Sequence, residues 1–124
     1  MKIAVDAMGG DNAPKAIVQG AEKFAKEFKD AEVTLYGDEG AVKKYLTSDI
    51  ENIHIVHTSE VITGDDDPVR SIRRKKDSSL VKAAYDVKNG EQYGLLSAGN
   101  TGALLSAGTL IVGRIPGVIR PALM

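Results

Sequence analysis

Short apolar segments alternate with longer segments of helical periodicity along most of this chain. Four apolar runs have the length and composition of buried strands: Lys2–Val5, Val33–Tyr36, Ile53–His57 and Leu95–Leu96. Strands that alternate with helices are typical of a parallel sheet with helices on both faces. The alternation therefore predicts an α/β fold, and 124 residues are enough for one domain with one core.

The segments between these strands are predicted as helices from their periodicity and end signals. After Pro14, apolar residues at helical spacing mark the face expected to pack on the sheet: Ile17, Ala21, Phe24 and Phe28. Ser78 or Ser79 is expected to cap a helix that runs through Asn89 and stops at Gly90. The other predicted helices are Ala41–Leu46, Val69–Lys76 and Gly102–Val112.

The segment Tyr93–Val112 combines a short strand, a loop of small residues and an apolar helix. Its loop contains Ser97, Gly99, Asn100, Thr101 and Gly102. Glycine lets a backbone approach a ligand closely, and the N–H groups that open a helix favour an anion. Asn100 and Thr101 add side-chain donors. The alternative is an ordinary turn in which Asn100 or Thr101 caps the helix.

Three loops follow the carboxyl ends of predicted parallel strands and should therefore share one edge of the sheet. They are Asp6–Asn12, Thr58–Ser79 and Ser97–Gly102. Ligands of parallel sheets bind at this edge. The first loop pairs two carboxylates with two glycines, in the order Asp6, Gly9, Gly10 and Asp11. Its alternative interpretation is an approach to the next helix, capped by Asp11 or Asn12.

The second loop carries a basic cluster. Arg70, Arg73 and Arg74 recur at i, i+3 and i+4, which places them on one helix face. Arginine can grip a phosphate through two parallel hydrogen bonds. A solvated face is the alternative for this cluster. The three residues Asp65–Asp67 either balance its charge or take part in the site.

Composition excludes several classes of function. A net charge of −1 gives no global reason to bind nucleic acid or an anionic membrane, and the absence of cysteine removes disulfides and thiolate sites. No apolar run approaches the roughly 20 residues that span a bilayer. His54 and His57 are three apart on a predicted strand, so they face opposite ways and make a poor metal pair. We expect no metal site.

Three motifs together resemble the bacterial phosphate acyltransferase family. They are IAVDAMGGDNAP near the start, DDDPVRSIRRKKDSSL in the middle and SAGNTGALL near the end. The resemblance implies a Rossmann-like α/β/α sandwich, similar to phosphotransacylase and isocitrate-dehydrogenase-like folds. It implies transfer of an acyl group from acyl-[acyl carrier protein] to inorganic phosphate for phospholipid synthesis, without a cofactor. It also implies a cytoplasmic homodimer, and it leaves peripheral membrane association open.

The resemblance further implies the site residues, by motif position. The catalytic group is expected to be Asp6, Asn100 and Thr101. The residues expected to bind phosphate or acyl donor are Gly9, Gly10, Asp11, Arg70, Arg73, Lys76, Ser78, Ser79, Ser97, Gly99 and Gly102. Two rival functions stay open. One is a phosphotransacylase that uses coenzyme A thioesters, and the other is a phosphate-binding or dimer-forming unit without turnover.

The end of the sequence has the character of an unfinished domain. Ile115–Gly117 is expected to turn, and Arg120–Met124 is expected to begin another strand. The apolar helix before them should need cover on most sides. We therefore expect residues 1–124 to form the N-terminal part of a longer protein. On its own this part should be inactive and should expose apolar surface.

Overall fold

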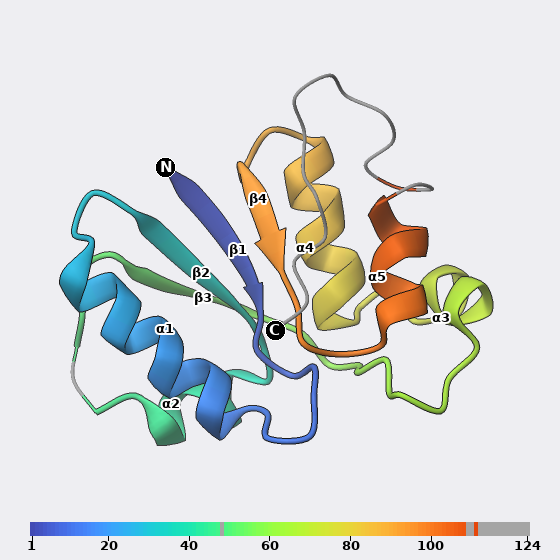
Figure 1. The fold of residues 1–124 in the computed structure, drawn as a ribbon, viewed down its shortest axis with the longest axis horizontal. Coiled ribbons are helices and arrows are strands. Elements are labelled where there is room, and N and C mark those ends of the chain that lie inside the picture. The colour runs from blue at the N-terminus through green and yellow to red at the C-terminus, as the bar shows by residue number, and fades with distance from the viewer. Residues whose placement is uncertain (48, 109–110, 112–124) are drawn as a thin grey trace.

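A four-stranded parallel sheet forms the centre of the computed structural model, which describes residues 1–47, 49–108 and 111 (Figure 1). The strands are β1 (Lys2–Asp6), β2 (Glu32–Gly37), β3 (Ile53–His57) and β4 (Gly94–Leu96). Their order is β3-β2-β1-β4, and every neighbouring pair is parallel. All four strands were predicted from the sequence, and the predicted parallel sheet is confirmed.

Five helices of the described residues connect or follow these strands. They are α1 (Lys15–Glu27), α2 (Glu39–Tyr45), α3 (Pro68–Arg74), α4 (Ser79–Lys88) and α5 (Thr101–Ala107). Each corresponds to a predicted helix, and Ser78 caps α4 as expected. Residues 109, 110 and 112 of the last predicted helix lie outside the described residues, as do the predicted turn Ile115–Gly117 and the predicted strand at Arg120–Met124.

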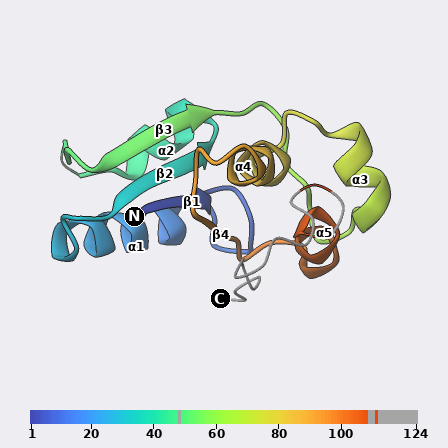
Figure 2. The same ribbon diagram turned by 90° about the horizontal axis from the view of Figure 1, so that it is seen from above.

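Helices cover both faces of the sheet, which confirms the predicted sandwich. Val5, Val33 and Leu35 pack against α1 and α2 in one apolar cluster. Ala4, Tyr36 and Leu95 belong to a second cluster with α4 and α5. Figure 2 shows α1 and α4 on opposite sides of the strands. Burial raises the pKa of Tyr36, and its hydroxyl donates to Asp86 over 2.6 Å.

The buried face of α1 differs from the predicted stripe. Ala21 is buried as expected, but Phe24 and Phe28 are 37% and 51% exposed. The sheet instead receives Val18 and small alanines, which allow the helix to approach the strands closely. Glu22 is also buried, and it accepts hydrogen bonds from the backbone N–H and the hydroxyl of Thr47. The helix was predicted correctly, but the residues that face the sheet lie about one position away from the predicted ones.

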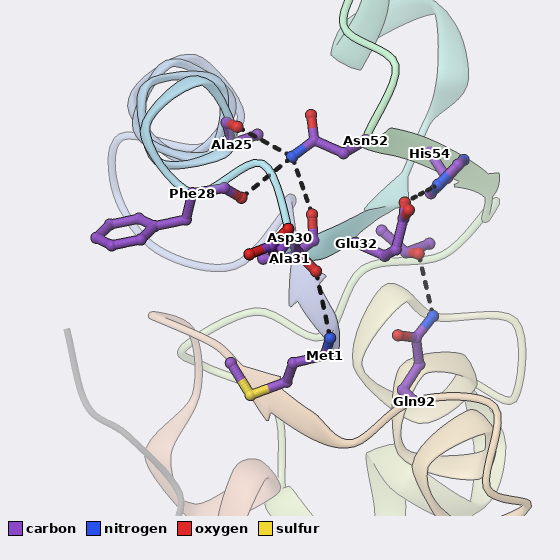
Figure 3. Close-up of polar contacts among 10 residues, drawn as sticks. Met1, Ala25, Phe28, Asp30, Ala31, Glu32, Asn52, His54 and Gln92 are labelled. Atoms are coloured by element: carbon purple, nitrogen blue, oxygen red, sulfur yellow. Dashed lines mark hydrogen bonds and ion pairs between the residues drawn. The ribbon is translucent and has the colours of Figure 1, made fainter.

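A buried amide holds the amino edge of the sheet together. The Asn52 side chain donates to the carbonyl oxygens of Ala25, Phe28 and Ala31 at 2.9, 3.3 and 2.9 Å (Figure 3). It therefore joins the end of α1 to the starts of β2 and β3.

No helix of the described residues is long and apolar enough to cross a membrane.

Candidate functional site at the carboxyl edge of the sheet

The Asp6 carboxylate is the point at which three loops meet at the carboxyl edge of the sheet. Asp6 ends β1 and is only 4% exposed. Its Oδ1 accepts from the Ser79 hydroxyl at 2.5 Å and from the Met8 backbone N–H at 3.1 Å. Its Oδ2 accepts from the Ser97 hydroxyl at 2.9 Å. The predicted meeting of the loops after β1, before α4 and after β4 is therefore confirmed.

Glycines bring two of these loops into backbone contact. A Cβ atom on Gly9 would lie 2.7 Å from Asp6 Oδ2 and 3.0 Å from Gly99 Cα. Gly10 has a φ of +101°, and a Cβ there would lie 3.0 Å from the Ala98 carbonyl oxygen. Any larger residue at Gly9 would push the loops apart. The close approach that requires Gly9 is thus between two loops of the protein itself.

The Asn100 side chain is fully committed to the protein. Its Oδ1 accepts from the Ala103 N–H at 3.0 Å and caps α5. Its Nδ2 donates to the carbonyl oxygens of Thr63 and Asp66, each at 3.0 Å. Asn100 therefore caps α5, and it also fastens the loop before α3 to the start of α5. Thr101 begins α5, and its side chain lies outside the described part of the structure.

The loop before α3 is braced by Lys75. The Lys75 ammonium donates to the Val61 carbonyl oxygen at 2.8 Å and pairs with Asp66 at 2.7 Å. The hydrogen bond from Lys75 lowers the pKa of the Asp66 carboxyl group. Asp67 caps α3 by accepting from the Arg70 N–H. Of the three aspartates whose role was left open, Asp66 balances the charge of Lys75 and Asp67 caps the start of α3.

A second carboxylate, Asp77, holds the start of the loop before α3 at Ser59. Asp77 accepts from the hydroxyl and the backbone N–H of Ser59, at 2.5 and 2.9 Å. The hydrogen bond from the Ser59 hydroxyl lowers the pKa of Asp77. Thr58 Oγ1, just after β3, is buried without a hydrogen-bond partner among the described residues.

The remaining predicted residues divide by exposure. The side chains of Ser78, Ser79 and Ser97 are buried, and Ser78 is occupied by its cap to Val81 N–H. The exposed residues of the predicted set are Gly10, Asp11, Arg70, Arg73 and Lys76. Neither Asp11 nor Asn12 caps α1, which begins after Pro14 without a side-chain cap. The exposed residues are the ones that a ligand at this edge could reach directly.

The basic cluster faces solvent from α3. Arg70, Arg73 and Arg74 are exposed, and within the described ranges none of them forms an ion pair. The inward positions of α3 are held by Ser71 and Ile72, and binding of a substrate by Arg70 or Arg73 stays a prediction.

Sequence reasoning missed two contacts that shape the site. One is the Lys75 brace, which was hidden inside a basic run. The other is the contact of α3 with α5, where a Cβ on Gly102 would lie 2.6 Å from Pro68 Cγ. The pattern Asn-x-Gly-Ala at the start of α5, repeated as Asp-x-Gly-Ala at the start of α2, was a usable capping signal.

Comparison with known proteins shows the family to which the chain belongs. The family described as "Fatty acid synthesis protein" matches residues 1–124. A phosphate acyltransferase of Enterococcus faecalis is 61% identical over 124 residues, covering 100% of this chain and 37% of that relative. A phosphate acyltransferase of Geobacillus is 58% identical over 123 residues, covering 99% of this chain and 37% of the relative. The chain thus spans little more than a third of the length of these relatives.

Proposed function

Because this chain belongs to the family of fatty acid synthesis proteins, we propose that the intact protein is a phosphate acyltransferase of phospholipid synthesis. It transfers an acyl group from acyl-[acyl carrier protein] to inorganic phosphate. The observation that carries the proposal is the convergence of the loops after β1, before α4 and after β4 on Asp6. Ligands of parallel α/β sheets bind at this carboxyl edge.

Phosphate is itself the nucleophile of this reaction, so the protein has to position the substrates and need not supply a nucleophile. A phosphate oxygen attacks the thioester carbonyl carbon, the new C–O bond forms, and the C–S bond breaks with its electron pair on sulfur. The proton of hydrogen phosphate ends on the carrier thiol. Orientation and preorganised hydrogen-bond donors can supply most of the acceleration. We assign phosphate to the loops Gly9–Asp11 and Ser97–Gly102.

The second substrate requires a surface for the carrier protein. The described cations Arg70, Arg73, Arg74 and Lys76 are exposed on and just after α3, beside the loop that Asn100 fastens. We assign this basic face to the acidic carrier protein, because complementary charge mainly raises the rate of encounter and fixes orientation. The face lies at the same edge as the phosphate loops, so a docked carrier would present its thioester there.

Assembly and completeness belong to the same proposal. The intact protein acts as a cytoplasmic homodimer with peripheral membrane contact, and residues 1–124 alone have no turnover. An apolar groove of about 300 Å³ supports the proposal that another part of the intact protein, or a second copy, covers this unit. It runs along α1 and is lined by Ile3, Ile17, Phe24 and Leu96, among others. An apolar surface of this kind normally has a cover.

The experiment is a product assay on the intact protein. Acyl-[acyl carrier protein] and phosphate are supplied, and the product is followed by phosphorus NMR. The proposal predicts acyl phosphate in proportion to carrier thiol released. Equal rates with acyl-coenzyme A would favour a phosphotransacylase, and free fatty acid without acyl phosphate would contradict phosphate transfer. Binding of phosphate without any turnover would favour the non-catalytic alternative.

A further inference from the structure

The Asp6 carboxylate is buried together with the two hydroxyl groups that donate to it. Asp6 is 4% exposed, Ser79 1% and Ser97 2%. Both carboxylate oxygens already accept hydrogen bonds from the protein, and Oδ1 accepts two. Within the described part of the chain no cation pairs with it. A group enclosed in this way cannot touch a substrate unless the loops separate.

A buried carboxylate is costly unless its hydrogen bonds are complete. Hydrogen bonds to an ionised oxygen are shorter and stronger than neutral ones, so this group holds its donors firmly. The ten-residue helix α4 begins at Ser79, and its N-terminal dipole favours the negative charge. The three donors come from three segments: the loop after β1, the start of α4 and the loop after β4. The Asp6 carboxylate is therefore a junction that holds these three segments in fixed positions.

The junction is coupled to the loop backbones through Gly9. A Cβ there would clash with Asp6 Oδ2 and also with the backbone of Gly99. Ser97 extends the chain of contacts, because its hydroxyl accepts from the Gly99 N–H at 3.2 Å while donating to Asp6. A shift of the carboxylate would therefore move Gly9 and Gly99 relative to each other.

We propose that Asp6 is a positioning residue, which acts through Ser97 and Ser79 to hold the Gly9–Gly10 and Ala98–Asn100 loops at the separation that phosphate binding requires. The inference rests on the phosphate acyltransferase function proposed above. It revises the expectation that Asp6 is catalytic and that Ser79 and Ser97 bind phosphate: the three side chains bind one another, and the loops around them bind the ligand.

The test compares Asp6→Asn, Ser97→Ala and Ser79→Ala in the intact protein. Loss of the Ser97 tie should raise the KM for phosphate by roughly tenfold, because a hydrogen bond to a charged group is lost at the ligand loop. The KM for the acyl donor should change much less. The double variant Asp6→Asn/Ser97→Ala should be no worse than Asp6→Asn alone, because both changes break the same tie.

Asn52→Ala is the matched control. Asn52 is another buried polar junction with three hydrogen bonds, but it lies at the amino edge of the sheet (Figure 3). Its loss should lower the melting temperature and leave the KM for phosphate unchanged. If Ser97→Ala and Asp6→Asn behaved like Asn52→Ala, the junction would be merely structural and the inference would be wrong.

Two further outcomes separate the remaining explanations. If Asp6→Asn abolished turnover while both serine variants kept the wild-type KM for phosphate, Asp6 would act on the reacting atoms, contrary to the inference. The amide signals of Gly10 and Gly99 provide a readout without turnover. In Ser97→Ala these amide signals should shift, and the amide protons should exchange faster with solvent. This expectation does not depend on turnover: if the wild-type protein formed no acyl phosphate, only the proposed function would be overturned. Unchanged signals would overturn the positioning role.

Discussion

Asn100 illustrates what a single residue reveals in sequence and what it does not. Its place before a helix and after a strand indicated a cap, and the structure confirms one. Its bonds to Thr63 and Asp66 join residues 37 and 34 positions apart, and nothing in the local sequence specifies those partners. The same limit applies to Ser79 and Ser97. Their loops were predictable, but their common acceptor Asp6 depends on the folded chain.

Replacement of Asn100 by alanine should weaken phosphate use. The variant loses the cap of α5, which is worth about 1 kcal/mol, and releases the loop before α3 from the phosphate loop. In the intact protein the KM for phosphate should rise more than the KM for the acyl donor. Asp38→Ala is the matched control, because Asp38 caps α2 in the same way through Ala41. An unchanged phosphate dependence in Asn100→Ala would refute this role.

At the scale of the element, helix α1 shows the limit of periodicity. An apolar spacing identified the helix, but the residues that face the sheet were set by close packing of alanines. Phe24 lines an apolar groove beside Leu96 of the edge strand β4 instead of entering the core. Sequence periodicity thus locates an amphipathic helix more reliably than it orients one.

The contact between α3 and α5 predicts opposite effects for two glycines in equivalent positions. Gly102 and Gly40 are each the second residue of a helix with an Asx cap. Gly102→Ala should destabilise the protein by about 1–3 kcal/mol, because the new Cβ would overlap the rigid ring of Pro68. Gly40→Ala meets nothing closer than 3.6 Å and should stabilise by up to about 1 kcal/mol. Urea unfolding measures both. Equal effects would show that α3 moves away freely.

The basic face of α3 should set the rate of carrier encounter. Arg73→Glu should raise the KM for acyl-[acyl carrier protein] several-fold at low salt, and less at high salt, because exposed charges are screened. The KM for phosphate should change little. Lys23→Glu is the control, an exposed charge reversal on α1. If Arg73→Glu matched Lys23→Glu at every ionic strength, α3 would be a solvated face.

At the scale of the whole molecule, alternation of strands and helices was sufficient to predict a parallel sheet with its loops at one edge. All four strands and five helices of the described residues agree with that pattern. The strand order β3-β2-β1-β4 was not predicted, because it depends on which strands meet after the crossovers. The groove beside β4 was not predicted either, because its lining depends on which residues of α1 face the sheet.

The central claim is that inorganic phosphate binds where the loops after β1 and β4 meet. A phosphate titration of the isotope-labelled intact protein, followed by amide NMR, tests it most directly. Saturable shifts should centre on Gly10, Gly99 and Gly102, with no response from Asn52 at the opposite edge, and sulfate should compete only weakly with phosphate. Saturable shifts centred on the amino edge, or none at the three glycines, would contradict the account.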